Sequence, residues 1–104
     1  MEQITKEQVM KVLMKVNDPE LRLNIVDLGL VYEVEVTPDN NVGVDMTLTS
    51  PACPVGPLMQ SQAEAAIKTI EGVNQVDVQI VFDPPWTESM MSERLKKARQ
   101  MGLL

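Results

Sequence analysis

The spacing of apolar residues changes several times along the chain, and each change predicts a boundary between helix and strand. Apolar residues at every third or fourth position are typical of amphipathic helices, and apolar residues at every second position are typical of strands with one buried face. The helical spacing occurs in three stretches, 6–16, 58–70 and 88–102. The alternating spacing occurs in three others, 30–36, 42–49 and 76–82. The predicted order of elements is therefore α-β-β-α-β-α.

Residues that favour helix ends support these boundaries. Thr5 and Gln8 form a capping-box pattern before the first helix, and Thr87 is the expected N-cap of the last one. Gly72 and Gly102 are expected to end the second and third helices, because glycine readily adopts the left-handed conformation found after a helix. Three apolar residues are expected on the buried side of the last helix: Met91, Leu95 and Ala98.

The connections between the elements predict the fold class. Turn-forming residues at 37–41 predict that the first two strands form a hairpin, and a right-handed crossover through the second helix makes the third strand parallel to the second. The expected fold is α/β (α+β), a small two-layer sandwich with a three-stranded mixed sheet that helices cover on one face. The strand order stays open. Residues 20–29 have no clean period and are expected to form a packed loop or a short helical turn ended by Gly29. One side of the third strand is expected to carry Val76, Val78, Ile80 and Phe82.

Length and charge limit the class of protein. A chain of 104 residues predicts one domain, over residues 1–104. The formal net charge of -6 disfavours nucleic acid and anionic membranes as partners, because both bind basic patches, and the one basic cluster, 94–99, is interpreted as a solvated helix face. No apolar run approaches the roughly 20 residues of a membrane span, no secretory signal pattern is present, and a single cysteine excludes an internal disulfide. We therefore expect a cytoplasmic protein.

The chain has no histidine, which excludes imidazole both as a general base and as a metal ligand. Cys53 is then the only strong nucleophile and the only soft metal ligand. It lies on a proline-rich loop between a strand and a helix, where helix amides can stabilise a thiolate. The alternative interpretation is a small buried apolar side chain, which is the usual environment of a free cysteine.

A single thiolate cannot hold an iron–sulfur cluster or a tetrahedral zinc ion, because these centres take four ligands. Two chains that present Cys53 across a symmetry axis would supply two thiolates, and carboxylates or an external thiol would complete the site. Such a site would be labile, which suits transfer better than storage. We therefore expect no tightly bound cofactor, and a transient cluster shared between the chains of a homodimer stays open.

Five further side chains are candidates for a functional role. Asp18, Glu20 and Asp27 could supply hard metal ligands or a general base, or they could be solvated or capping residues. Thr49 ends the second strand, where its hydroxyl could bond the loop backbone or a ligand. Trp86, which follows a proline-rich turn, could form a docking surface or could cover the core.

Four segments, in order and with compatible spacing, carry a resemblance to a known family. They are residues 18–21 (DPEL), 24–32 (NIVDLGLVY), 47–54 (TLTSPACP) and 81–87 (VFDPPWT). Together they resemble the PaaD-like and SufT-like iron–sulfur cluster assembly family over nearly the whole chain. The resemblance implies a small α/β domain with a hairpin, in agreement with the fold expected from the apolar pattern.

The resemblance implies maturation of iron–sulfur proteins, by carrying clusters or helping to insert them, without turnover of a metabolite. We therefore expect that the protein is not an enzyme. The implied partners are iron–sulfur scaffold or carrier proteins and apo iron–sulfur enzymes, and any ATPase step would come from a partner. The family's reactive cysteine, acidic loop positions and strand-end hydroxyls fall respectively on Cys53, on Asp18, Glu20 and Asp27, and on Thr49 and Ser50.

Three classes of function come into question, the first of them in two forms. The protein could carry a cluster through Cys53, or it could act as an adaptor that supports maturation without holding metal. A second class of function is an accessory maturation subunit for one multicomponent ring oxygenase, of the phenylacetate type. A thiol enzyme is disfavoured, because no histidine, no CxxC motif and no second cysteine are present to activate or recycle the thiol.

Overall fold

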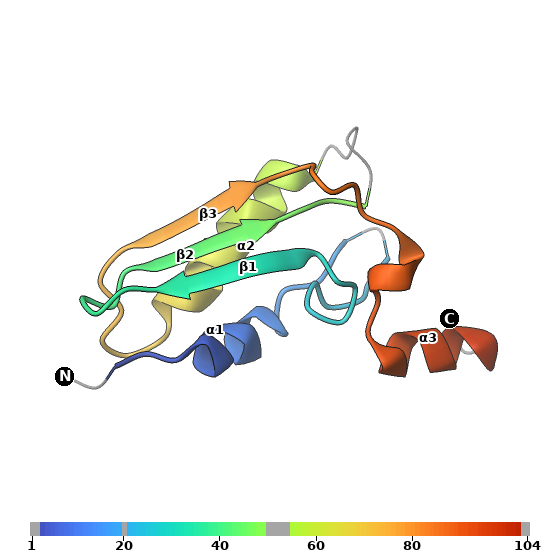
Figure 1. Cartoon of the computed structure of the whole chain (residues 1–104), viewed down its shortest axis with the longest axis horizontal. Coiled ribbons are helices and arrows are strands. Elements are labelled where there is room, and N and C mark those ends of the chain that lie inside the picture. Colours follow the sequence, from blue (N-terminus) through green and yellow to red (C-terminus); the bar gives the residue numbers. More distant parts are fainter. Residues whose placement is uncertain (1–2, 20, 50–54, 103–104) are drawn as a thin grey trace.

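The computed structural model describes residues 3–19, 21–49 and 55–102, and it confirms the predicted order of elements (Figure 1). A short 3₁₀ helix, η1, is added before the last α-helix. The elements are α1 (Lys6–Leu13), β1 (Val31–Val36), β2 (Val42–Met46), α2 (Gly56–Lys68), β3 (Val76–Ile80), η1 (Glu88–Met90) and α3 (Glu93–Gln100).

The three strands form a single mixed sheet in the order β1-β2-β3. β1 pairs with β2 in antiparallel orientation, with Val34 opposite Val44, and β3 pairs with β2 in parallel orientation, with Val78 opposite Val44. The hairpin and the parallel crossover strand are therefore confirmed. The structure also supplies the strand order, which the sequence pattern left open.

The core lies between the sheet and a layer of helices on one of its faces, and Figure 1 shows α2 behind the sheet. Alternate residues of β2 are fully buried, as are Leu13 of α1 and Met59 of α2. The opposite face of the sheet carries polar side chains, among them Glu33, Glu35 and Asp77, which are exposed. One-sided burial explains why the two strands of the hairpin alternate so regularly between apolar and polar residues.

The first helix begins as predicted and ends earlier than predicted. The Thr5 hydroxyl accepts the Gln8 N–H at 3.1 Å, and the Gln8 side-chain oxygen accepts the Thr5 N–H at 2.8 Å, which confirms the capping box. The expected helix 6–16 stops at Leu13. After Leu13 the Lys15 and Val16 N–H groups donate to carbonyls three residues back, which ends the α-helix in tighter turns. The Val16 carbonyl then accepts the Ile25 N–H of the following loop at 2.9 Å.

Two expectations for the C-terminal third are wrong. Phe82 does not share the buried side of the third strand, because β3 ends at Ile80 and the Phe82 side chain is 48 % exposed. The last helix does not run from 88 with Thr87 as its cap; Ser92 caps α3, and its hydroxyl accepts the Leu95 N–H at 3.3 Å. The backbone of Met91 is extended and separates η1 from α3. The Ser92 N–H that follows donates to the Asp27 carbonyl in the loop before β1.

The described part of the chain holds no helix long and apolar enough to cross a membrane.

Candidate functional site

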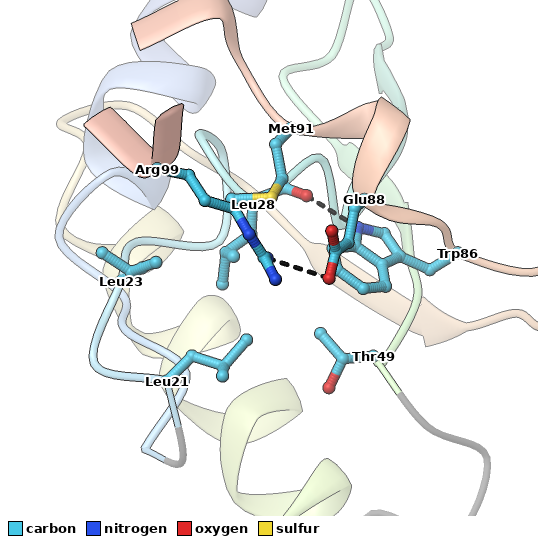
Figure 2. A pocket seen from close by; sticks show the side chains of 8 residues that line it. All are labelled: Leu21, Leu23, Leu28, Thr49, Trp86, Glu88, Met91 and Arg99. Carbon is cyan, nitrogen blue, oxygen red and sulfur yellow. Dashed lines mark hydrogen bonds and ion pairs between the residues drawn. The ribbon is translucent and has the colours of Figure 1, made fainter. Parts of the chain in front are cut away.

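A cavity of about 500 Å³ lies where the loop before β1, the end of β2 and the C-terminal segment meet (Figure 2). The side chains in Figure 2 come from these three segments, which are far apart in the sequence. Most of the lining is apolar, and Thr49 and one ion pair add polar groups. The eight lining residues are Leu21, Leu23, Leu28, Thr49, Trp86, Glu88, Met91 and Arg99.

Trp86 forms one wall of this pocket and also packs against the core. Its indole N–H donates to the Leu28 carbonyl at 2.7 Å, so its one polar atom is satisfied by the backbone of the facing loop. The two interpretations of Trp86 therefore do not exclude each other. Its ring covers part of the core, and one side of the ring lines the pocket.

Glu88 and Arg99 form an ion pair that links η1 to α3 across the pocket, as Figure 2 shows. The Arg99 guanidinium lies 2.8 Å from the Glu88 carboxylate, and both side chains are more than half exposed. An exposed pair of this kind contributes little to stability, typically about 0–1 kcal/mol. It nevertheless places one cation and one anion beside an otherwise apolar surface.

The basic cluster 94–99 is more than a solvated helix face. Arg94 pairs with Asp27, Lys96 lies 3.7 Å from Glu93, and Arg99 pairs with Glu88. Arg94, Lys97 and Arg99 stay exposed, as expected, and Lys96 is half-buried. Two of the four side chains connect α3 to other segments of the chain.

Asp27 precedes Leu28, which lines the pocket, and is held by three neighbours. The Asn24 side-chain amide donates to its carboxylate at 2.7 Å, Arg94 forms an ion pair with it, and the Ser92 side chain also hydrogen-bonds to it. Burial by itself raises the pKa of this carboxyl, but the hydrogen bonds and the charge of Arg94 outweigh burial and bring the pKa below its usual value. Asp27, in the loop before β1, is therefore an ionised side chain with a structural role, and it binds residues at the start of α3.

Replacing Asp27 with asparagine is expected to destabilise the protein by about 1–3 kcal/mol near neutral pH, because Arg94 and Ser92 lose a charged partner. A carboxyl with a lowered folded-state pKa contributes stability above its unfolded pKa, and this contribution disappears as the pH falls through the folded pKa. Urea denaturation should therefore separate wild type from Asp27→Asn near pH 7 and bring the two curves together as the pH falls through the lowered folded-state pKa of Asp27. A difference that persisted unchanged in acid would contradict this assignment.

The other predicted site residues are placed as follows. Asp18 is buried, and its carboxylate accepts the Leu21 N–H at 3.2 Å, so it organises the turn that leads to the pocket without lining it. Thr49 lines the pocket together with Trp86. Glu20, Ser50 and Cys53 lie outside the described residues. No group of three or more acidic or cysteine residues that could hold a metal ion occurs within 3–19, 21–49 and 55–102.

Sequence reasoning missed the residues that make Thr49 and Trp86 part of one pocket. Leu21 and Leu23 belong to a stretch without a clean period, and Glu88, Met91 and Arg99 belong to the segment that was expected to be one helix. The one signal in the sequence was an apolar residue, Leu21, in a stretch without a clean period. The structure shows that its side chain is 46 % exposed.

The fold and this site define a small α+β domain with an apolar pocket at one end of its sheet. A family model described as "Iron-sulfur cluster assembly protein" matches residues 6–80, and the chain belongs to this family. The resemblance identified in the sequence is thereby confirmed, and the chain is an iron–sulfur cluster assembly protein.

Individual relatives agree with this assignment. The chain is 42 % identical over 98 residues to the Fe-S protein maturation auxiliary factor YitW of Bacillus subtilis, covering 94 % of this chain and 96 % of the relative. It is 47 % identical over 81 residues to the Fe-S protein maturation auxiliary factor SufT of Staphylococcus aureus, covering 78 % and 92 %. A conserved hypothetical protein from Thermotoga maritima has a similar structure, with a TM-score of 0.83, 48 % identity and 98 % coverage of both chains. These similarities do not favour the ring-oxygenase alternative.

Proposed function

We propose that this protein assists the maturation of iron–sulfur proteins through Cys53 and through the pocket that Thr49 and Trp86 line. Cys53 would serve as a transient thiolate ligand or as a docking thiol, and the pocket would receive part of a partner protein. The observation that carries the proposal is the position of Thr49, which lines the pocket four positions before the only cysteine of the chain. One residue of the pocket therefore belongs to the same short stretch of sequence as the thiol.

The donor set supports transient binding of a cluster. Iron–sulfur clusters prefer thiolate ligands, and this chain supplies one per copy. A second copy, an external thiol or a client cysteine would have to complete the site, and ligands supplied by a client would draw the cluster toward it. The cluster is in this view the cargo of the protein. Asp27 is committed to Arg94 and Ser92, so it is a poor candidate for a metal ligand.

The pocket supports a protein partner. Its walls are leucine, methionine and tryptophan side chains, which are typical of surfaces that bury an apolar side chain of another protein. The names of the relatives YitW and SufT describe Fe-S protein maturation auxiliary factors, and we extend that role to this chain. The partners would be iron–sulfur scaffold or carrier proteins and apo iron–sulfur enzymes in the cytoplasm.

Deletion of the gene tests the function. Under iron limitation we expect the specific activity of a cluster-dependent dehydratase such as aconitase to fall in extracts, while the amount of aconitase protein stays constant. Wild-type protein supplied in trans should restore the activity. Dehydratase activity that stayed intact in the deletion strain under both iron limitation and oxidative load would argue against a general maturation role.

Carrier and adaptor roles predict different results in vitro. A carrier should acquire stoichiometric iron and sulfide, with visible charge-transfer absorption, when it is reconstituted anaerobically, and it should pass them to an apo dehydratase. An adaptor should stay colourless and should still accelerate loading of the apo enzyme by a separate scaffold.

A further inference from the structure

We propose that Asp27 is a positioning residue for partner binding: through Arg94 and Ser92 it holds in place α3, which contributes Arg99 to the pocket. This proposal rests on the proposed function in taking the pocket as the partner site. Asp27 is not among the eight residues that line the pocket, so it would act through the elements that it holds.

The helix α3, which Asp27 holds, buries few apolar side chains of its own. Leu95 is the single buried residue of α3, whereas α2 buries Gly56, Met59, Ala63 and Ile67. One buried leucine is a small hydrophobic anchor for a helix of eight residues. Figure 1 shows α3 beside the sheet layer, at the far end of the molecule from the hairpin turn. Its position therefore depends on polar contacts to a greater degree than that of α2.

Apart from the exposed Arg99–Glu88 ion pair, the polar contacts described for α3 with other segments converge on Asp27. The Ser92 N–H donates to the Asp27 carbonyl at 2.7 Å, and the Ser92 and Arg94 side chains both bind the Asp27 carboxylate. Asn24 holds Asp27 from the other side, with its side-chain oxygen accepting the Asp27 N–H at 2.8 Å. The carboxylate also lies at the N-terminus of α3, where the helix dipole favours an anion. We call this set, Asn24, Asp27, Ser92 and Arg94, the clasp.

The consecutive residues 27–29 connect the clasp to the pocket. The carbonyl of Leu28 accepts the Trp86 indole N–H, and Leu28 itself lines the pocket. Gly29 packs against the Met90 backbone so closely that a Cβ atom there would fall on its carbonyl group. Residues 27, 28 and 29 thus each contact the segment that carries the opposite wall. A change at Asp27 should therefore alter the distance between Met91 and Arg99 on one side of the pocket and its lining leucines on the other.

Trp86 provides a direct readout, because it is the only tryptophan of the chain and lies in the pocket. We would compare the full-length protein with Asp27→Asn and Arg94→Met, using acrylamide quenching of Trp86 and hydrogen exchange of the α3 amides. We expect quenching to rise about twofold and exchange across α3 to rise about tenfold or more, with sheet amides unchanged. Arg94→Lys keeps the charge and should restore part of the protection.

The matched control is Lys97→Met, which removes the same charge from the same helix. Lys97 is exposed, and no ion pair of Lys97 occurs in the described part of the chain. This variant should leave quenching and exchange at wild-type values. If Asp27→Asn unfolds, Arg94→Met still tests the proposal, because the Arg94 side chain is 68 % exposed and its loss leaves no cavity.

The same variants are then supplied to the deletion strain at matched protein levels. Restored dehydratase activity should fall at least about threefold for Arg94→Met and stay at the wild-type level for Lys97→Met. Unchanged quenching and exchange in Arg94→Met would overturn the clasp as the support of α3. Altered quenching and exchange with full restoration of activity would overturn its role in partner binding. If deletion has no phenotype, the proposed function fails, while the quenching and exchange measurements still decide whether the clasp holds α3.

Discussion

Cys53→Ser is expected to restore almost none of the dehydratase activity that the deletion removes. A serine hydroxyl is not ionised near neutral pH and is a hard oxygen donor, so it replaces neither the nucleophilicity nor the soft-ligand character of a thiolate. The variant changes one atom, which keeps the size and polarity of the side chain similar. We expect activity within about twofold of the deletion strain, measured at protein levels matched by immunoblot.

Ser61→Ala is a suitable control for this comparison, because Ser61 is exposed on α2 and should behave as wild type. Cys53→Ala extends the test by removing the polar atom altogether. Full restoration of activity by both Cys53 variants would exclude the thiol from the mechanism. The pocket would then be the only candidate site left, and the protein would act as an adaptor.

Gly29→Ala is expected to lower the free energy of unfolding by about 3 kcal/mol or more, a larger loss than the same substitution at Gly43 or Gly102. Gly29 has a φ of 80°, and this left-handed conformation costs other residues roughly 1–2 kcal/mol. A Cβ atom would in addition collide with the Met90 carbonyl, which is backbone and cannot rotate away. Either η1 must move away from the loop or the loop must change its conformation, and both disrupt the pocket. Urea denaturation measures the loss directly.

The two other glycines separate the contributions to this loss. Gly102 also has a positive φ, 74°, but a Cβ atom there would meet nothing within 4 Å, so Gly102→Ala should cost only the conformational part, about 1 kcal/mol. Gly43 has open space and no positive φ, so Gly43→Ala should change stability by less than about 0.5–1 kcal/mol. A Gly29→Ala variant no less stable than Gly102→Ala would show that the contact with Met90 is not tight.

The apolar pattern predicted the hairpin well because each of its strands buries one face only. Val42, Val44 and Met46 are buried and alternate with half-buried residues, as period two requires. The same reasoning failed at Phe82, because β3 loses its partner strand after Ile80 and the alternation continues without a sheet to face. It failed again at Thr87, because a cap depends on where the helix actually begins.

The pocket was not predictable from the sequence by comparable means. Thr49 and Trp86 were singled out separately, by their position after a strand and by residue type. Nothing local indicates that both meet Leu21 and Arg99. The Arg94–Asp27 pair joins residues 67 positions apart, and many other acidic residues could have been the partner of Arg94.

The sequence by itself determined the order of elements, the capping box at Thr5, the family and the single thiol at Cys53. These properties depend on the identity of residues and on the spacing of near neighbours, which the chain specifies directly. The tertiary structure alone decided the strand order, the early end of α1, the pocket and the ion pair between Asp27 and Arg94. These properties depend on which distant segments pack together, because burial and ion pairing are decided by contacts in space and leave no period in the sequence.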